Sequence, residues 1–248
     1  MTTKRSAENS DVMSRPQEAI TFHARQVRDL KKLVSQGEGS RLEFKRKASY
    51  PDKIVRELIA FANAHGGTLL VGISDDGDLA GLKHPEGESH VIQQSLRKCK
   101  PGLPVTESLI PIGSGKYVIQ YHIAESQHKP HYFLDGEKKQ SFIRVNDQSI
   151  RASREVREIA RRSQLKKDIR FHYGEHEQFL MHYLDTNPSI TLRQFMEVSR
   201  LKRFYASKKL VLLVLANVLQ ITPHEKGDLF SLAFGNETGI KDSKKIVF

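Results

Sequence analysis

The sequence of 248 residues predicts a mixed α/β (α+β) domain, built on a mixed sheet, followed by a small domain of three helices and a β-hairpin. Helix and strand patterns alternate between residues 41 and 145, which predicts the first domain. A strongly basic stretch follows at 151–170, and after residue 175 come three helix patterns and two short strand patterns. The length suits two modest domains, since one domain usually has roughly 100 to 200 residues.

The first domain is expected to open with an amphipathic helix. Apolar residues recur at helical spacing from residue 16 to residue 36, and Gly37 ends the pattern. Residues 41–46 then alternate apolar and charged side chains, which is the period of a half-buried strand. A second helix is predicted over 51–65, with proline in its first turn and Gly66-Gly67 as its stop.

The remaining segments of this domain supply the other strands. Residues 68–73 form a nearly continuous apolar run, which is typical of a central strand covered on both faces. An acidic turn follows at 75–78. A helix is expected over 89–98, and further strand candidates are 105–110, 117–123 and 141–145.

The second domain has the element order of a winged helix-turn-helix. Helices are expected over 175–186, 189–199 and 204–218, and short strands over 219–223 and 229–233. The last helix is apolar on nearly all sides from Leu210 onward, so it is either deeply buried or part of a dimer interface. A homo-oligomer is therefore a candidate assembly.

These patterns divide the chain into five parts. The predicted parts are a disordered tail (1–15), a domain with an N-terminal helix (16–162), a basic linker helix (163–174), a winged-helix-like domain (175–235) and a second tail (236–248).

Composition favours a polyanionic partner. The chain carries 40 Lys and Arg against 29 Asp and Glu, which gives a formal charge of +11 and a field that attracts nucleic acid. A basic protein with no such partner is the plain alternative. A single cysteine, Cys99, excludes an internal disulfide and a zinc finger of paired cysteines. We expect a cytoplasmic protein without a membrane partner, because neither a secretory signal nor an apolar run of about 20 residues is found.

Four segments, in this order, resemble the AlbA_2 domain of Schlafen-like proteins and of many bacterial regulators. They are residues 38–45 (EGSRLEFK), 60–77 (AFANAHGGTLLVGISDDG), 129–133 (KPHYF) and 142–146 (FIRVN), and the likeness spans residues 36–162. The resemblance implies a compact mixed domain that is often described as DNA-binding, and in older descriptions as ATP-binding. In this chain helix, glycines and strand follow one another, whereas a P-loop runs strand, glycines, helix. We therefore interpret Gly66-Gly67 as a helix stop.

The resemblance also implies a candidate catalytic site. Schlafen domains cut structured RNA with two glutamates and an aspartate, which would correspond to Glu38, Glu43 and Asp75. If the first two strands are neighbours, these carboxylates could hold Mg²⁺ or Mn²⁺ and activate water for phosphodiester cleavage. Lys45 lies two residues after Glu43 and shares its face of the strand, where it could stabilise a phosphate. The commoner alternative is an ion pair of Glu43 with Lys45, and a turn at Asp75.

Basic side chains supply the candidate nucleic-acid contacts. The basic stretch could present a stripe of cations to phosphates, and the third helix of the second domain could enter a groove while the hairpin acts as a wing. The alternative for the stretch is a solvated linker helix. The predicted contacts are Lys45, Arg144, Arg151, Arg154, Arg157, Arg161, Arg203, Lys208, Lys209 and Lys226.

The preferred hypothesis is a DNA-binding transcriptional regulator. The alternative is a Schlafen-like, metal-dependent endoribonuclease that acts on structured RNA with Glu38, Glu43 and Asp75. A third hypothesis is a protein-interaction module that uses the apolar helix beginning at Leu210.

Overall fold

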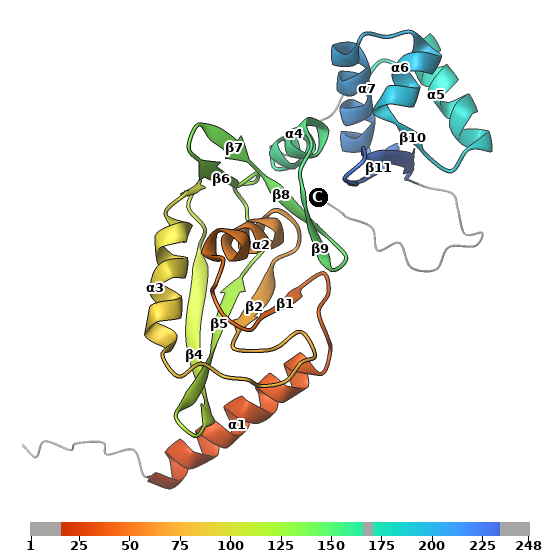
Figure 1. Ribbon diagram of the computed structural model, residues 1–248. Helices are drawn as coiled ribbons and strands as arrows, with labels where there is room; N and C mark the ends of the chain where they lie inside the picture. The colour runs from red at the N-terminus through yellow and green to blue at the C-terminus, as the bar shows by residue number, and fades with distance from the viewer. Residues whose placement is uncertain (1–15, 166–170, 234–248) are drawn as a thin grey trace, which may run out of the picture.

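The computed structural model describes residues 16–165 and 171–233 (Figure 1). The two predicted tails, 1–15 and 236–248, lie outside these residues. The N-terminal part contains α1 (Pro16–Val34), β1 (Leu42–Lys45), α2 (Pro51–Asn63), β2 (Gly67–Val71), α3 (Pro85–Leu96), β3 (Cys99–Lys100), β4 (Val105–Gly113), β5 (Lys116–Ile123), β6 (Tyr132–Asp135), β7 (Lys138–Gln140), β8 (Phe142–Val145), β9 (Gln148–Arg151) and α4 (Arg154–Ser163).

A sheet of four strands organises this part of the chain, and it is mixed, as predicted. Its strand order is β1-β2-β5-β4. β1 pairs with β2 in parallel, and the other two pairings are antiparallel. In the β1–β2 register Glu43 lies opposite Leu69. The parallel pair needs a crossover, and α2 provides it.

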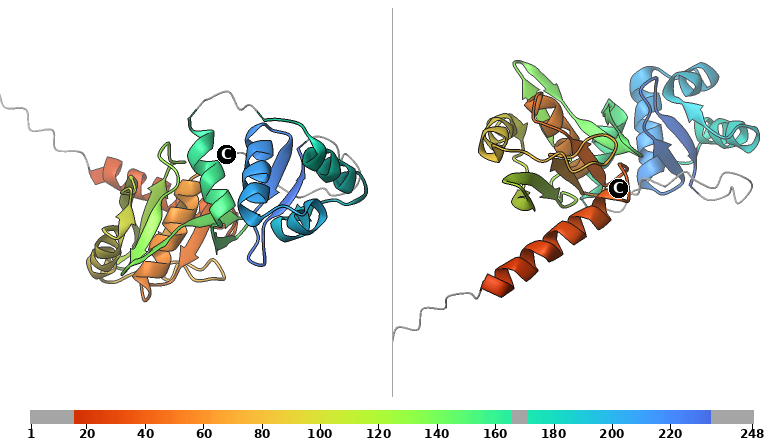
Figure 2. Two further views of the ribbon diagram at one scale, coloured as in Figure 1. Left: turned by 90° about the horizontal axis from the view of Figure 1, so that it is seen from above. Right: turned by 60° about the horizontal axis from the view of Figure 1, so that its bottom comes forward.

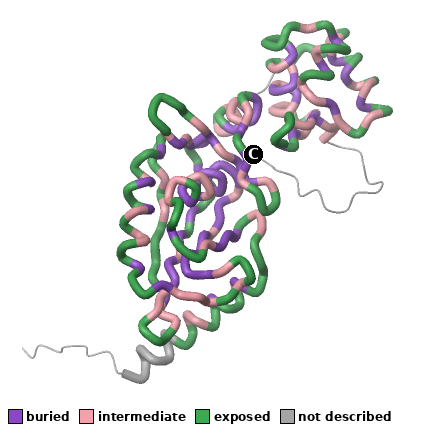
Figure 3. The backbone as a smooth tube through the Cα atoms, in the orientation of Figure 1, coloured by how far each residue is buried: buried purple, intermediate pink, exposed green. Residues whose placement is uncertain are grey.

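Both faces of the sheet are covered, which explains the continuous apolar run of β2. Leu69 and Val71 belong to a buried cluster with residues of α2 and α3, whereas Leu70 belongs to a separate cluster with Leu30 and Val34 of α1. Successive side chains of a strand point to opposite faces. The alternation therefore places α2 and α3 on one face and α1 on the other, with the buried residues concentrated between them (Figure 3).

The C-terminal unit, residues 171–233, has the predicted order of three helices and a hairpin. It contains α5 (Glu175–Thr186), β10 (Ile190–Thr191), α6 (Leu192–Ser199), α7 (Arg203–Leu215), β11 (Leu219–Thr222) and β12 (Leu229–Leu232). The short strand β10 adds to the hairpin, which makes a three-stranded sheet of order β10-β12-β11.

One hydrophobic core joins the C-terminal unit to α4 and to the β8–β9 hairpin. Ile143, Ile150, Val156 and Ile159 cluster with residues of α5, α6, α7 and the second sheet. In Figures 1 and 2, α4 lies between the mixed sheet and α7, in agreement with the packing of α4 on α7. This packing explains why α7 is apolar on nearly all sides. Helices α4 and α6 both pack against it, and Leu210, Val211 and Leu213 are buried within the chain.

The basic helix lies earlier in the chain than predicted. Helix α4 ends at Ser163, and residues 171–174 are not helical. The prediction of a linker helix over 163–174 is therefore wrong for the part of this range that the structure describes. Residues 166–170 lie outside the described part. Ser153 begins α4 by accepting a hydrogen bond from the Val156 backbone N–H. The apolar residues of α4 pack inward, which makes it part of the protein core.

None of the helices within residues 16–165 and 171–233 is long and apolar enough to cross a membrane.

Candidate nucleic-acid interface

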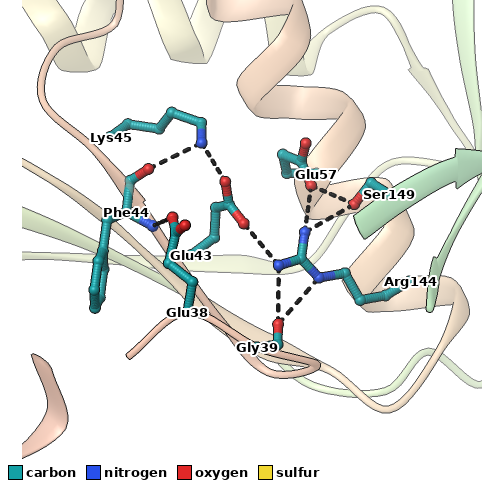
Figure 4. Close-up of polar contacts among 8 residues, drawn as sticks. All are labelled: Glu38, Gly39, Glu43, Phe44, Lys45, Glu57, Arg144 and Ser149. Atoms are coloured by element: carbon teal, nitrogen blue, oxygen red, sulfur yellow. Dashed lines mark hydrogen bonds and ion pairs between the residues drawn. The ribbon is translucent and has the colours of Figure 1, made fainter. Parts of the chain in front are cut away.

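Arg144 is the centre of a buried polar network between β1, α2 and the β8–β9 hairpin (Figure 4). Its guanidinium donates to the Gly39 carbonyl over 3.1 and 2.9 Å, to Glu57 over 2.8 Å, to Glu43 over 2.7 Å and to Ser149 over 3.2 Å. A guanidinium has five N–H donors, so these contacts can use all of them. Arg144 is 3% exposed. The sequence prediction that it contacts nucleic acid is therefore wrong.

Charged side chains of both signs lie around Arg144. Glu43 and Glu57 share the guanidinium, and Lys45 contacts Glu43, as the same-face spacing predicted. The pKa of Glu57 is raised, first because burial disfavours its charged form, while a hydrogen bond from Ser149 acts in the opposite direction. Glu43 is 7% exposed, so the pair with Lys45 is not the solvated surface pair considered from sequence.

The three carboxylates of the predicted metal site do not form a metal-binding group. Glu38 accepts the Phe44 backbone N–H over 2.8 Å, and both oxygens of Glu43 are taken by Arg144 and Lys45. Asp75 is exposed in the turn after β2. Within the described residues no group of three or more His, Cys, Asp or Glu side chains could hold a metal ion. The arrangement therefore does not fit the Mg²⁺ or Mn²⁺ expected from sequence.

A basic cleft opens between the N-terminal end of α4 and the C-terminal unit. Its volume is about 710 Å³. Six of its lining side chains are Arg or Lys, and three are Asp or Glu. The cations are Arg151, Arg154, Arg157, Arg193, Arg203 and Lys226, and the acids are Glu155, Glu225 and Asp228. Five of the ten cations predicted to bind nucleic acid therefore meet in one place.

Three helices begin at this cleft. Arg154, Leu192 and Arg203 are the first residues of α4, α6 and α7, and all three line it. The backbone N–H groups at a helix start are partly unpaired and carry a partial positive charge, which favours anions. Side chains of Ser153 and Thr191 cap α4 and α6, whereas α7 has no side-chain cap. The N-terminus of α7 therefore lacks the side-chain acceptor that the other two helix starts have.

The acidic side chains of the cleft have internal roles. Glu155 is 4% exposed and accepts a hydrogen bond of 2.6 Å from Ser207 of α7, which ties α4 to the C-terminal unit. The pKa of Asp228 is raised, mainly by burial and also by the nearby charge of Glu155, and a hydrogen bond from Ser153 partly offsets this. Glu155 therefore has a structural role at the contact between α4 and the C-terminal unit.

The other predicted cations lie outside the cleft. Arg161 is exposed and pairs with Glu158 over 2.8 Å, and Lys209 pairs with Glu177 of α5. Lys208 is exposed on α7. Sequence reasoning did not select Arg193 of α6, which lines the cleft. Its position at the start of a predicted helix, two residues after the capping Thr191, was the available signal.

Comparison with known proteins finds a family match in the N-terminal part of the chain. The family model described as Schlafen, AlbA_2 matches residues 38–153. No curated protein matches the chain. Among solved structures, that of the DIP2311 protein from Corynebacterium diphtheriae is similar, with 20% identity and a TM-score of 0.40. The match covers 61% of this chain and only 30% of the DIP2311 chain.

Proposed function

Residues 38–153 form a domain of the Schlafen AlbA_2 family, and from this premise we propose that the protein binds nucleic acid in the cleft between α4 and the C-terminal unit. The observation that carries the proposal is the convergence of six cations and three helix starts on this one cleft. Phosphates are held in proteins by such groups, namely Arg and Lys side chains and the N–H groups at helix N-termini.

The finer proposal is a DNA-binding transcriptional regulator. Residues 175–233 have the element order of a winged helix, in which the hairpin forms the wing and the last helix is the recognition helix. Lys226 lies in the turn of the hairpin and Arg203 at the start of α7, and both line the cleft. The cations of α4 face the same space, so both units would contact one duplex.

Salt-dependent binding of duplex DNA tests the proposal. Fluorescence anisotropy with a labelled duplex should give an affinity that falls steeply with salt, because each neutralised phosphate releases counterions. Lys226→Glu and Arg154→Glu should weaken binding at every sequence, and each should lower the salt slope by about one. Lys32→Glu is the matched control, since Lys32 is exposed on α1 and does not line the cleft. Equal losses for Lys32→Glu and Lys226→Glu would refute the cleft as the binding site.

The same preparation separates binding from cleavage. The alternative function, a metal-dependent endoribonuclease, predicts that structured RNA is cut when Mn²⁺ is added. Cleavage lost in Glu38→Gln, with normal folding, would favour that alternative. The pairing of Glu43 with Arg144 and Lys45 supports binding without cleavage.

A further inference from the structure

Exposed aromatic rings gather on the C-terminal unit. Five of them lie between residues 171 and 205, namely Phe171, Tyr173, Phe179, Phe204 and Tyr205. Phe204 and Tyr205 are each more than half exposed and contact one another edge to face, with ring centroids 5.4 Å apart. Single exposed apolar residues are ordinary, whereas a group of them marks an interaction surface.

Some of these rings line a small hollow of about 230 Å³ beside α7. Residues three, four and seven positions apart share a face of a helix. The hollow lies between one face of α7 and the segment before α5. The segment contributes Phe171 and His172, and α7 contributes Tyr205, Lys208, Lys209 and Leu212.

The charged residues in and near the hollow indicate which kind of ligand would fit it. The acidic residue in its lining, Glu177, is 3% exposed and pairs with Lys209. Lys208 is exposed, and so are Lys202 and Arg203 in the preceding turn. Aromatic rings flanked by exposed cations suit a nucleotide, because the base stacks on a ring while the phosphate meets a cation.

The hollow and the basic cleft lie on different sides of α7. Arg203 lines the cleft and Tyr205 lines the hollow. Two residues advance an α-helix by about 200°, since there are about 3.6 residues per turn. The first turn of α7 therefore separates the cleft from the hollow.

We infer that the hollow stacks an unpaired nucleotide, so that the preferred ligand is a duplex with a single-stranded overhang. The duplex phosphates lie in the basic cleft, and the first unpaired base reaches Tyr205 around the start of α7. This inference rests on the proposed function, and it adds the structural class of the nucleic acid.

The test compares a blunt duplex with the same duplex carrying a short overhang. The full chain should bind the overhang duplex roughly 5- to 100-fold more tightly, as expected for one stacked base. Tyr205→Ala should remove this preference, and Tyr205→Phe should keep it because the ring remains. Phe179→Ala is the matched control, an exposed aromatic on α5 that does not line the hollow. 2-Aminopurine at the first unpaired position should lose fluorescence on binding to the wild type, and not to Tyr205→Ala.

Equal affinity for blunt and overhang duplexes would overturn the inference, as would equal effects of Tyr205→Ala and Phe179→Ala. These results leave the proposed function intact if Lys226→Glu still weakens binding of the blunt duplex. Conversely, tight binding of the overhang strand alone with no effect of Lys226→Glu would refute the cleft and, with it, a duplex with an overhang as the preferred ligand.

Discussion

Arg144 Nη2 donates a hydrogen bond to Glu43 Oε2 across 2.7 Å, and this contact joins residues 101 positions apart in the chain. The same guanidinium lies 5.0 Å from the Phe61 ring and also pairs with Glu57, so one side chain connects β1, α2 and the β8–β9 hairpin. A buried charge of this kind is tolerated because every donor has an acceptor.

Replacing Arg144 with Met should destabilise the protein strongly. The substitution leaves the buried Glu43 without one of its two cations and the half-buried Glu57 without its guanidinium partner, for which a loss of about 3–5 kcal/mol in the free energy of unfolding is expected. Urea denaturation measures it, with Lys32→Met as a surface control. The double variant Arg144→Met with Glu43→Gln should recover part of the loss, since one uncompensated charge is removed. A loss below about 1 kcal/mol would contradict the role given to this network.

His131 should make stability depend on pH. Its side chain is buried and lies 2.6 Å from the Ser126 hydroxyl and 2.9 Å from the Pro101 carbonyl. Burial lowers its pKa below 6.5. The unfolded state therefore binds more protons, and stability should be full above about pH 6.5 and fall as the pH drops below it. Urea denaturation between pH 7.5 and 5 should show a weaker dependence in His131→Asn, whereas the exposed-site variant His90→Asn should behave as wild type.

Cys99 should be unreactive in the folded protein. It is buried, and burial raises the pKa of its thiol to about 12, so the thiolate is scarce at pH 8. A chromogenic disulfide reagent should modify it slowly in buffer and rapidly in denaturant. Fast modification of the native protein, at the rate of the denatured one, would show that this part of the core is open.

Ser153→Ala should cost about 1 kcal/mol in the free energy of unfolding, within the range for loss of a helix cap. The hydroxyl accepts the Val156 N–H over 3.0 Å at the start of α4. Ser163→Ala is the control at the other end of the same helix, where the hydroxyl donates to the Ala160 carbonyl. Thermal unfolding compares the two, and a smaller effect at Ser153 than at Ser163 would be inconsistent with the cap.

Most of the helices and strands could be predicted from the sequence, because the patterns that indicate them are local. The apolar run of β2, the proline at the start of α2 and the glycines after it are read from a few neighbouring residues. Short strands such as β3 and β10 were missed, since a two-residue strand depends on its partner and has no period of its own.

The candidate site was predicted only in part, because burial and pairing depend on distant residues. Arg144 and Arg151 look equivalent in sequence, yet the first meets two carboxylates inside the protein and the second faces the cleft. Likewise, the family resemblance and the places of Glu38, Glu43 and Asp75 beside two strands suggested a metal site, and nothing nearby in the sequence indicated that Arg144 would pair with Glu43.

The position of α4 determines which part of the chain could be transferred to another protein with its core complete. The family match ends at Ser153, yet the helix that this residue caps completes the hydrophobic core of the C-terminal unit. A graft that transfers residues 171–233 alone would leave behind Val156 and Ile159, and with them one wall of that core. The smallest transplantable piece therefore includes the β8–β9 hairpin and α4, and it overlaps the end of the family domain.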